Sequence, residues 1–232
     1  MSTSTLNIPM PREQLERVVR QIVREGFAAR LQAGETQLSA AYTSNLVVNI
    51  SARHMHVSPE HLETLFGPGA ELTVYRWLYQ PGEFAAEQTV TLIGPRRRLI
   101  DKVRILGPVR QRSQVELSFT DSIALGVDAP LRPSGQLDAT PGCLIMGPKG
   151  TIELPDGVIR AERHVHMSPA DAGTYGFRDQ QYVKLRVESD CAVVFENVLC
   201  RVSPDVLLEV HIDTDEGNAC NLVNATNVEL LP

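Results

Sequence analysis

The chain has 232 residues, of which 43% are hydrophobic and 22% charged, and its formal net charge is −6 at pH 7. These proportions are those of an ordinary globular protein, and the acidic balance argues against a general nucleic-acid-binding protein, which needs a basic surface. No apolar run reaches the roughly 18 residues that span a bilayer, and the N-terminus lacks the apolar core of a secretory signal. We therefore expect a soluble intracellular protein with one large or two small domains.

The first 45 residues have the pattern of an extension. Residues 1–10 are polar, and from Pro11 apolar residues recur at helical spacing, with arginines and glutamates between them. The apolar positions are Leu15, Val18, Val19, Ile22, Val23 and Phe27. This periodicity predicts an amphipathic helix, and the small, polar stretch AGETQLSAAYTS after it is typical of a linker. Two interpretations stay open: the helix packs on its own domain, or it docks on a partner protein.

From Leu46 onward the pattern changes to short strands. Segments rich in β-branched residues alternate with Gly or Pro turns, as in LVVNISA, ELTVYRWL, EQTVTLI, KVRILGPV, SQVELSF, QYVKLRVES, AVVFENVLCRV and VLLEVHI. The stretch TIELPDGVIRAE predicts a β-hairpin. Short helices are expected after Ser58-Pro59, after Ser168-Pro169 and from about Asp215, because serine caps a helix and proline suits its first turn. The predicted fold class is mainly β, with barrels capped by short α-helices behind an N-terminal helical extension.

One heptapeptide occurs twice in nearly the same form. RHMHVSP begins at Arg53, and RHVHMSP begins at Arg163. Residues i and i+2 of a strand point to the same side, so each copy presents two imidazoles together, as a divalent cation requires. The paired histidines are His54 with His56 and His164 with His166. The repeat predicts two related units that both contribute to one site.

The two other histidines differ in their setting. His211 lies in EVHIDTDEGNACN, at the end of an apolar strand and before an acidic turn, and is a further candidate ligand. His61 falls on the helix expected after the first motif, and we expect a surface or packing role for it. The spacing of the first histidine pair to Glu60 and Gly67 also fits a cupin metal site, but Ser58-Pro59 starts a helix where a cupin needs a strand.

Residues 104–127, RILGPVRQRSQVELSFTDSIALGV, lie between the two motifs. This segment, both histidine motifs and HIDTDEGNA closely resemble the PduL-type phosphate propanoyltransferase (phosphotransacylase) family, from about Leu46 to Leu222. The resemblance implies that acyl-CoA, with propanoyl-CoA as the expected substrate, and inorganic phosphate are interconverted with acyl phosphate and CoA. It also implies two β-barrel domains, residues 46–52 together with 162–232 and residues 53–161, with the active site between them.

The resemblance further implies two zinc ions and assigns their ligands. The first zinc would be held by His54, His56 and Glu116, and the second by His164, His166 and His211. Three protein ligands leave a position open for substrate, as in catalytic zinc sites. Arg110 matches the family's phosphate-binding arginine, and a planar guanidinium suits a phosphate group. The residues expected to contact CoA are Ile50, Ser51, Ala52, Arg97, Arg104 and Asn218.

The chain offers no nucleophile elbow and no cysteine with an obvious partner histidine. The expected mechanism is therefore direct attack of phosphate on the thioester, with zinc as Lewis acid. One competing interpretation is a two-metal zinc hydrolase of thioesterase type, in which an activated water attacks instead. Another is a non-enzymatic metal module in an assembly, which would need closed four-ligand sites.

The resemblance also bears on location and partners. Members of the family work free in the cytosol or inside bacterial microcompartments, and packaged members carry an amphipathic N-terminal helix and a linker, which is the pattern of residues 11–45. We therefore expect a protein of the bacterial cytoplasm that resides inside a microcompartment. Its N-terminal helix would bind shell or cargo proteins, and the enzyme would be a homo-oligomer. Neither nucleic acid nor membrane is expected as a partner.

Overall fold

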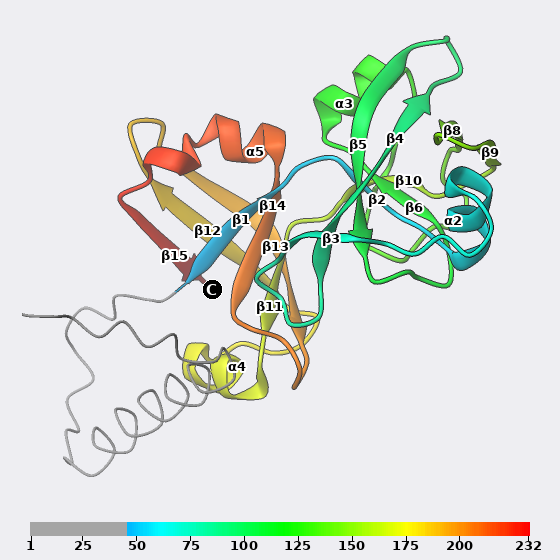
Figure 1. The fold of residues 1–232 in the computed structure, drawn as a ribbon. Coiled ribbons are helices and arrows are strands. Elements are labelled where there is room, and N and C mark those ends of the chain that lie inside the picture. The colour runs from blue at the N-terminus through cyan, green and yellow to red at the C-terminus, as the bar shows by residue number, and fades with distance from the viewer. Residues whose placement is uncertain (1–45) are drawn as a thin grey trace, which may run out of the picture. The chain divides into compact units, whose positions relative to one another are not determined.

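The structure is a computed structural model that describes residues 46–232, and Figure 1 shows its fold. The predicted N-terminal helix and its linker lie outside these residues. The described part is mainly β, as the sequence predicted, and consists of two curled sheets with a few short helices. Within it, no helix has the length and apolar character needed to cross a bilayer.

The six-stranded sheet joins the beginning of the described chain to its end. Its order is β1-β14-β11-β13-β12-β15, and β1 pairs in parallel with β14. The strands are β1 (Val47–Ser51), β11 (His164–Met167), β12 (Tyr182–Glu188), β13 (Val193–Val202), β14 (Glu209–Asp213) and β15 (Asn227–Leu231). The short helices α4 (Pro169–Tyr175), α5 (Thr214–Ala219) and η1 (Leu222–Asn224) lie in the connections.

The nine-stranded sheet takes all its strands from the chain between β1 and β11. Its order is β7-β10-β6-β2-β5-β4-β8-β9, and β3 pairs with β4. The strands are β2 (His54–His56), β3 (Val74–Trp77), β4 (Phe84–Ile93), β5 (Leu99–Gly107), β6 (Gln114–Glu116), β7 (Leu131–Arg132), β8 (Cys143–Met146), β9 (Thr151–Leu154) and β10 (Val158–Ala161). Two helices belong to this part, α2 (Pro59–Phe66) and α3 (Phe119–Leu125).

Serine caps define where the helices begin. Ser58 and Ser168 accept hydrogen bonds from backbone N–H groups in the first turns of α2 and α4, as predicted. Helix α3 was not predicted, and its first residue, Phe119, was assigned to the end of the strand SQVELSF. That strand ends at Glu116, and Ser118 caps α3 by accepting from the N–H of Asp121. Serine at an N-cap satisfies a backbone donor that the helix itself leaves free.

The hairpin predicted for TIELPDGVIRAE is wrong. β9 pairs with β8, whereas β10 lies parallel to both β6 and β7. Val158 and Ile159 are both fully buried, and because successive strand residues point to opposite faces, β10 must be covered on both faces. The Pro-Asp-Gly turn reverses the chain locally, but the burial of the next residues decides which strands they pair with.

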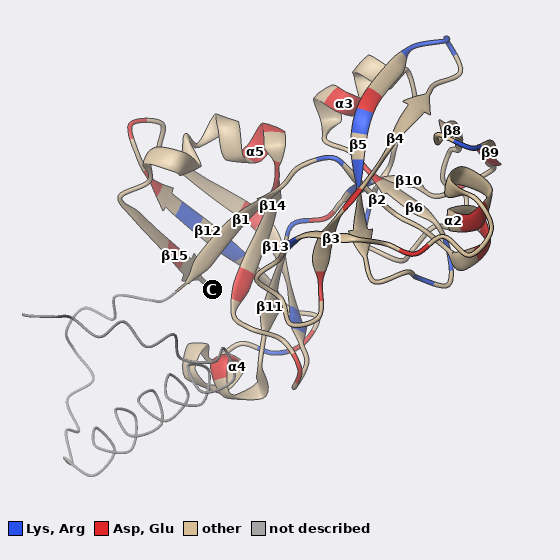
Figure 2. Cartoon of the chain, in the orientation of Figure 1, with Lys and Arg blue, Asp and Glu red and all other residues tan. Residues whose placement is uncertain are grey.

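Charged residues of both signs lie along the elements of both sheets (Figure 2). Exposed ion pairs link neighbouring strands, as between Lys184 and Glu196 or between Arg186 and Glu229. Such pairs contribute about 0–1 kcal/mol each, so they add little to the stability of the fold. Stability must come chiefly from the apolar side chains that the sheets bury.

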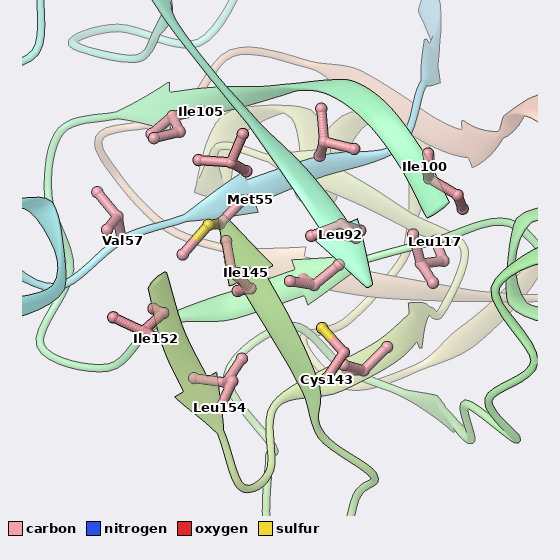
Figure 3. Close-up of a cluster of buried hydrophobic side chains, with 14 of the residues drawn as sticks. Met55, Val57, Leu92, Ile100, Ile105, Leu117, Cys143, Ile145, Ile152 and Leu154 are labelled. Carbon is pink, nitrogen blue, oxygen red and sulfur yellow. The ribbon is translucent and has the colours of Figure 1, made fainter. Parts of the chain in front are cut away.

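Each sheet covers its own apolar cluster. Figure 3 shows the cluster of the nine-stranded sheet, in which Met55, Ile105 and Ile145 are fully buried. The six-stranded sheet buries a second cluster that includes Val165 and Leu185. Burying one such side chain contributes about 1.5–3 kcal/mol. Met55 and Val165 are the middle residues of the two H-x-H triplets, so strand alternation sends them into the cores and turns the histidines to the opposite face.

Candidate metal centres and active-site cavity

Strand register brings the first group of predicted ligands together. β2 and β6 are antiparallel, with His54 directly opposite Glu116, and directly opposed residues point to the same face. Nε2 of His54 lies 3.2 Å from Nε2 of His56 and 3.5 Å from Oε2 of Glu116. Nε2 of His56 lies 3.8 Å from Oε1 of Glu116. All three side chains are buried. We call these residues the first triad.

The surroundings of the first triad favour the tautomer and the protonation states in which its side chains can bind a cation. Nδ1 of His54 donates to the carbonyl oxygen of Ala52 at 2.8 Å, which leaves the lone pair of Nε2 free. Burial lowers the pKa of His56 to about 3, so this ring is neutral at physiological pH. Burial raises the pKa of Glu116, but its attraction to His54 and His56 and a hydrogen bond from Ser134 outweigh that effect and lower it. A histidine binds a metal ion as the neutral imidazole, and a glutamate binds it as the ionised carboxylate.

The second group of predicted ligands converges on the other sheet. β11 and β14 are antiparallel, with His164 opposite His211. His166 follows His164 by two residues on β11 and therefore points to the same face. The ring centroids of His164 and His211 are 4.9 Å apart, and those of His166 and His211 are 5.2 Å apart. We call these residues the second triad. Within each triad the potential ligand atoms all lie within 4.8 Å of one another.

The second triad is held by contacts like those of the first. Nδ1 of His164 donates to the carbonyl oxygen of Glu162 at 2.8 Å, as His54 donates to Ala52. Burial lowers the pKa of His166 to about 4, and burial and the neighbouring His211 lower the pKa of His164. Nε2 of His211 is buried, makes no hydrogen bond of normal direction within the described part of the protein, and lies 3.1 Å from Oε2 of Glu209. Three converging imidazoles, two of which have a pKa lowered by burial, fit a borderline-soft divalent ion such as zinc.

One cavity of about 900 Å³ reaches both triads. Arg110 lies in its wall, where Nη1 donates to Oγ of Ser134 at 3.2 Å. The same Oγ donates to Oε1 of Glu116 at 2.8 Å, so Ser134 links Arg110 to the first triad. Partial burial lowers the pKa of Arg110, although Glu116 and Glu83 act in the opposite direction. The arginine remains a fixed cation beside the ligands.

The residues predicted to contact CoA fall into two groups. Ile50, Ser51, Ala52 and Arg104 line the cavity, and Arg104 lies next to His54 in the register of β5 and β2. Arg97 and Asn218 are exposed and do not line the cavity. Arg97 stands in the turn between β4 and β5, and Asn218 lies on α5. The structure therefore brings together only part of this predicted set.

Several cavity residues were missed by the sequence reasoning. They are Arg76, Trp77, Gln80, Glu83, Lys102, Ser134, Arg201 and Glu209. Arg201 is opposite His166 in the pairing of β11 with β13, but that register follows from the folded sheet and has no motif in the sequence. His61, which was predicted to have a surface or packing role, is half-buried, and its Nδ1 lies 2.7 Å from Oγ of Ser113.

Comparisons with known proteins agree with the resemblance found in the motifs. The family model described as phosphate propanoyltransferase matches residues 47–223, a span that contains both triads and Arg110. A phosphate propanoyltransferase from Planctopirus limnophila is 52% identical over 222 residues, which cover 95% of this chain and 91% of that protein. One from Thermotoga maritima is 52% identical and one from Salmonella typhimurium 49% identical, each over 178 residues that cover 76% of this chain and 84% of the relative. The chain belongs to the phosphate propanoyltransferase family.

Proposed function

We propose that the protein is a zinc-dependent acyltransferase that converts propanoyl-CoA and inorganic phosphate into propanoyl phosphate and CoA, and catalyses the reverse reaction. The observation that carries this proposal is a single cavity that joins two ligand triads to a fixed arginine. Thioester, phosphate and metal can all meet in such a space. Membership of an acyltransferase family supports the same conclusion.

In this proposal His54, His56 and Glu116 hold one zinc, and His164, His166 and His211 hold the other. The metals would supply Lewis acidity to the thioester carbonyl. Three protein ligands at each site leave room for substrate, whereas a purely structural metal module would have closed sites with four protein ligands.

Arg110 binds the attacking phosphate. Its guanidinium is held by Ser134 and faces the same cavity as Glu116, so it can fix a phosphate beside the first triad. Bidentate hydrogen bonds from a guanidinium orient a phosphate as well as attracting it. One phosphate oxygen then adds to the thioester carbonyl carbon, the C–S bond breaks, and CoA leaves as a thiolate. This is a direct transfer with no acyl-enzyme.

CoA lies along the basic wall of the cavity. Arg76, Lys102 and Arg104 line this wall, and the chain at residues 50–52 adjoins it. Their positive charges suit the phosphate groups of CoA, and Figure 2 shows basic residues on β5. Arg97 and Asn218 stay proposals as contacts for a part of CoA that extends beyond the cavity.

The wider organisation follows the family resemblance. We assign residues 46–52 together with 162–232 to one barrel domain and residues 53–161 to the other, because the sheets divide the chain in this way. Residues 1–45 would bind shell or cargo proteins and place a homo-oligomeric enzyme inside a microcompartment of the bacterial cytoplasm.

The deciding experiment is thiol release from propanoyl-CoA by the purified, zinc-assayed protein, with and without inorganic phosphate. Release that requires phosphate and yields an acyl phosphate supports the transferase. Release that is independent of phosphate would contradict it and would identify a thioesterase built on the same triads. No release from zinc-loaded protein would also contradict it and would favour a structural metal module.

A further inference from the structure

Glu209 is a buried carboxylate beside the second triad, and the proposed mechanism gives it no role. It lies on β14 two residues before His211 and opposite His166 in the neighbouring strand, so it faces the same side as both histidines. Only 2% of the residue is exposed. Oε2 of Glu209 lies 3.1 Å from Nε2 of His211, close but without the direction of a hydrogen bond.

Neutral amide groups hold this carboxylate in place. Nδ2 of Asn49 donates to Oε1, and Nε2 of Gln80 donates to Oε2 at 2.5 Å. Among the described residues, His211 is the one basic side chain within ion-pair distance of Glu209. A buried negative charge is costly when neutral donors alone compensate it, and a His211 ring that binds a metal is itself neutral, so the metal ion would supply the positive charge that Glu209 needs. The second triad is the adjacent site that can bind a cation.

The two triads differ in charge. The first contains the carboxylate of Glu116, whereas the second consists of three imidazoles, which are neutral when they bind a metal. We propose that Glu209 is the positioning carboxylate of the second metal site: it fixes His211 and supplies the negative charge that three neutral imidazoles lack. This inference rests on the proposed function, because it requires a metal ion in the second triad. Nδ1 of His211 lies 3.1 Å from Oγ of Ser51, so Ser51 and Glu209 contact the two ring nitrogens and together fix the orientation of the ring.

Gln80 connects this carboxylate to the other sheet. It lies in the turn between β3 and β4, and only 6% of it is exposed. Its Oε1 accepts from the N–H of Leu207 at 3.1 Å, and its Nε2 donates to the carbonyl oxygen of Leu207 at 3.0 Å as well as to Glu209. Gln80 therefore binds the backbone just before β14 and Glu209 at once. The position of His211 depends on a side chain supplied by the opposite sheet.

The test uses the full-length protein and the substitution Glu209→Gln, which keeps the shape of the side chain and removes its charge. Zinc affinity is measured by competition with a chelating dye, and the visible absorption of the cobalt-substituted protein reports ligand geometry. We expect the affinity of one of two zinc sites to fall about 10–100-fold and half of the cobalt spectrum to change. The other site serves as an internal control for folding. Glu229→Gln, an exposed carboxylate in the same sheet, should leave both sites unchanged.

Two zinc affinities and a cobalt spectrum identical to those of the unsubstituted protein would overturn the proposal. If Glu209→Gln does not fold, the variant Gln80→Ala tests the proposal, because it keeps the carboxylate of Glu209 and removes a hydrogen-bond donor that holds it in place. We then expect a several-fold weaker second site with an unchanged far-UV circular dichroism spectrum. Unchanged zinc binding in Gln80→Ala would overturn the proposal.

Failure of the proposed function gives a different result. An unsubstituted protein that binds two zinc ions but shows no phosphate-dependent thiol release would contradict the transferase and leave the role of Glu209 intact. An active, two-zinc protein in which Glu209→Gln changes neither affinity nor spectrum would contradict the role of Glu209 alone.

Discussion

His54 and Glu116 face each other across two antiparallel strands, and Nε2 of the histidine lies 3.5 Å from Oε2 of the carboxylate. Both strands are interior strands of the nine-stranded sheet, because β2 lies between β6 and β5 and β6 lies between β10 and β2. Neighbours on both edges fix the backbone, and burial restricts the side chains. The first triad is therefore organised before any metal binds, which reduces the entropy lost on binding.

Replacing Glu116 with glutamine should remove the zinc of the first triad. The amide keeps the size of the side chain but offers a neutral, weaker ligand. We expect about one zinc per chain in place of two and a fall in the transferase rate of about 100-fold or more. Elemental analysis and initial rates measure these effects. Glu153→Gln, an exposed residue of β9, is the matched control. A Glu116→Gln protein with two zinc ions would show that this carboxylate is not a ligand.

Replacing Arg110 with alanine should weaken the use of phosphate while both zinc ions stay bound. The loss removes a charge-assisted contact, so we expect the KM for phosphate to rise about 100-fold. Steady-state kinetics with varied phosphate and a zinc assay on the same sample test this. Arg112→Ala is the control, because Arg112 is exposed and pairs with Asp138 and Asp156. An unchanged phosphate dependence in Arg110→Ala would exclude the assigned role.

Removal of the metals should abolish transfer without unfolding the protein. Each sheet buries its own apolar cluster, and these clusters contain no metal ligand. We expect chelator-treated protein to keep its circular dichroism spectrum, to have a lower Tm and to regain activity with zinc. Magnesium should not restore activity, because it prefers oxygen ligands to imidazole. Full activity in metal-free protein would contradict zinc dependence.

Trp77 gives a direct signal for ligand binding. It is the only tryptophan of the chain, and it lines the cavity with 56% of its surface exposed. We expect its fluorescence to change when CoA is added, and Arg76→Ala to raise the Kd obtained from the titration about tenfold. Arg186→Ala, on β12 and outside the cavity, should leave the Kd unchanged. If CoA binds by calorimetry while Trp77 fluorescence stays constant, CoA lies elsewhere.

The histidine pairs could be predicted from the sequence because strand alternation acts over two residues. Glu116 could not be found in that way: its place opposite His54 depends on the pairing of β2 with β6, and only the family resemblance identified it. No sequence motif marks Glu209 or Gln80, because their contact joins two sheets and residues far apart in the chain. Local patterns thus predicted most strands, the helices with a Ser-Pro start and the paired ligands, whereas contacts between strands depend on a register that local patterns do not encode.

The errors in the fold have the same origin. The turn before β10 was correctly located, but its strand pairs with β6 and β7 and not with the preceding β9. Helix α3 was missed because it has only seven residues, lacks the Ser-Pro signal of α2 and α4, and its start is marked only by Ser118. Short apolar segments fit either structure until tertiary packing selects one.

Deletion of residues 1–40 should leave the catalytic rate unchanged. The family match begins at residue 47, and the relative from Thermotoga maritima aligns over only 76% of this chain. We expect normal kcat and zinc content, together with loss of packaging into microcompartments and weaker self-association. Enzyme assays, co-purification with shells and analytical ultracentrifugation test the three effects. A truncated protein without activity would show that the extension belongs to the catalytic unit.

The parallel pairing of β1 with β14 has a consequence for the order in which the two sheets fold during translation. All strands of the nine-stranded sheet emerge in one uninterrupted stretch, so the first triad can assemble while the rest is still being translated. β1 is made before them but has to wait for β14, near the C-terminus, as its partner. The second triad is therefore completed last, and a prematurely terminated chain would carry a single triad and an unpaired apolar strand that attracts chaperones.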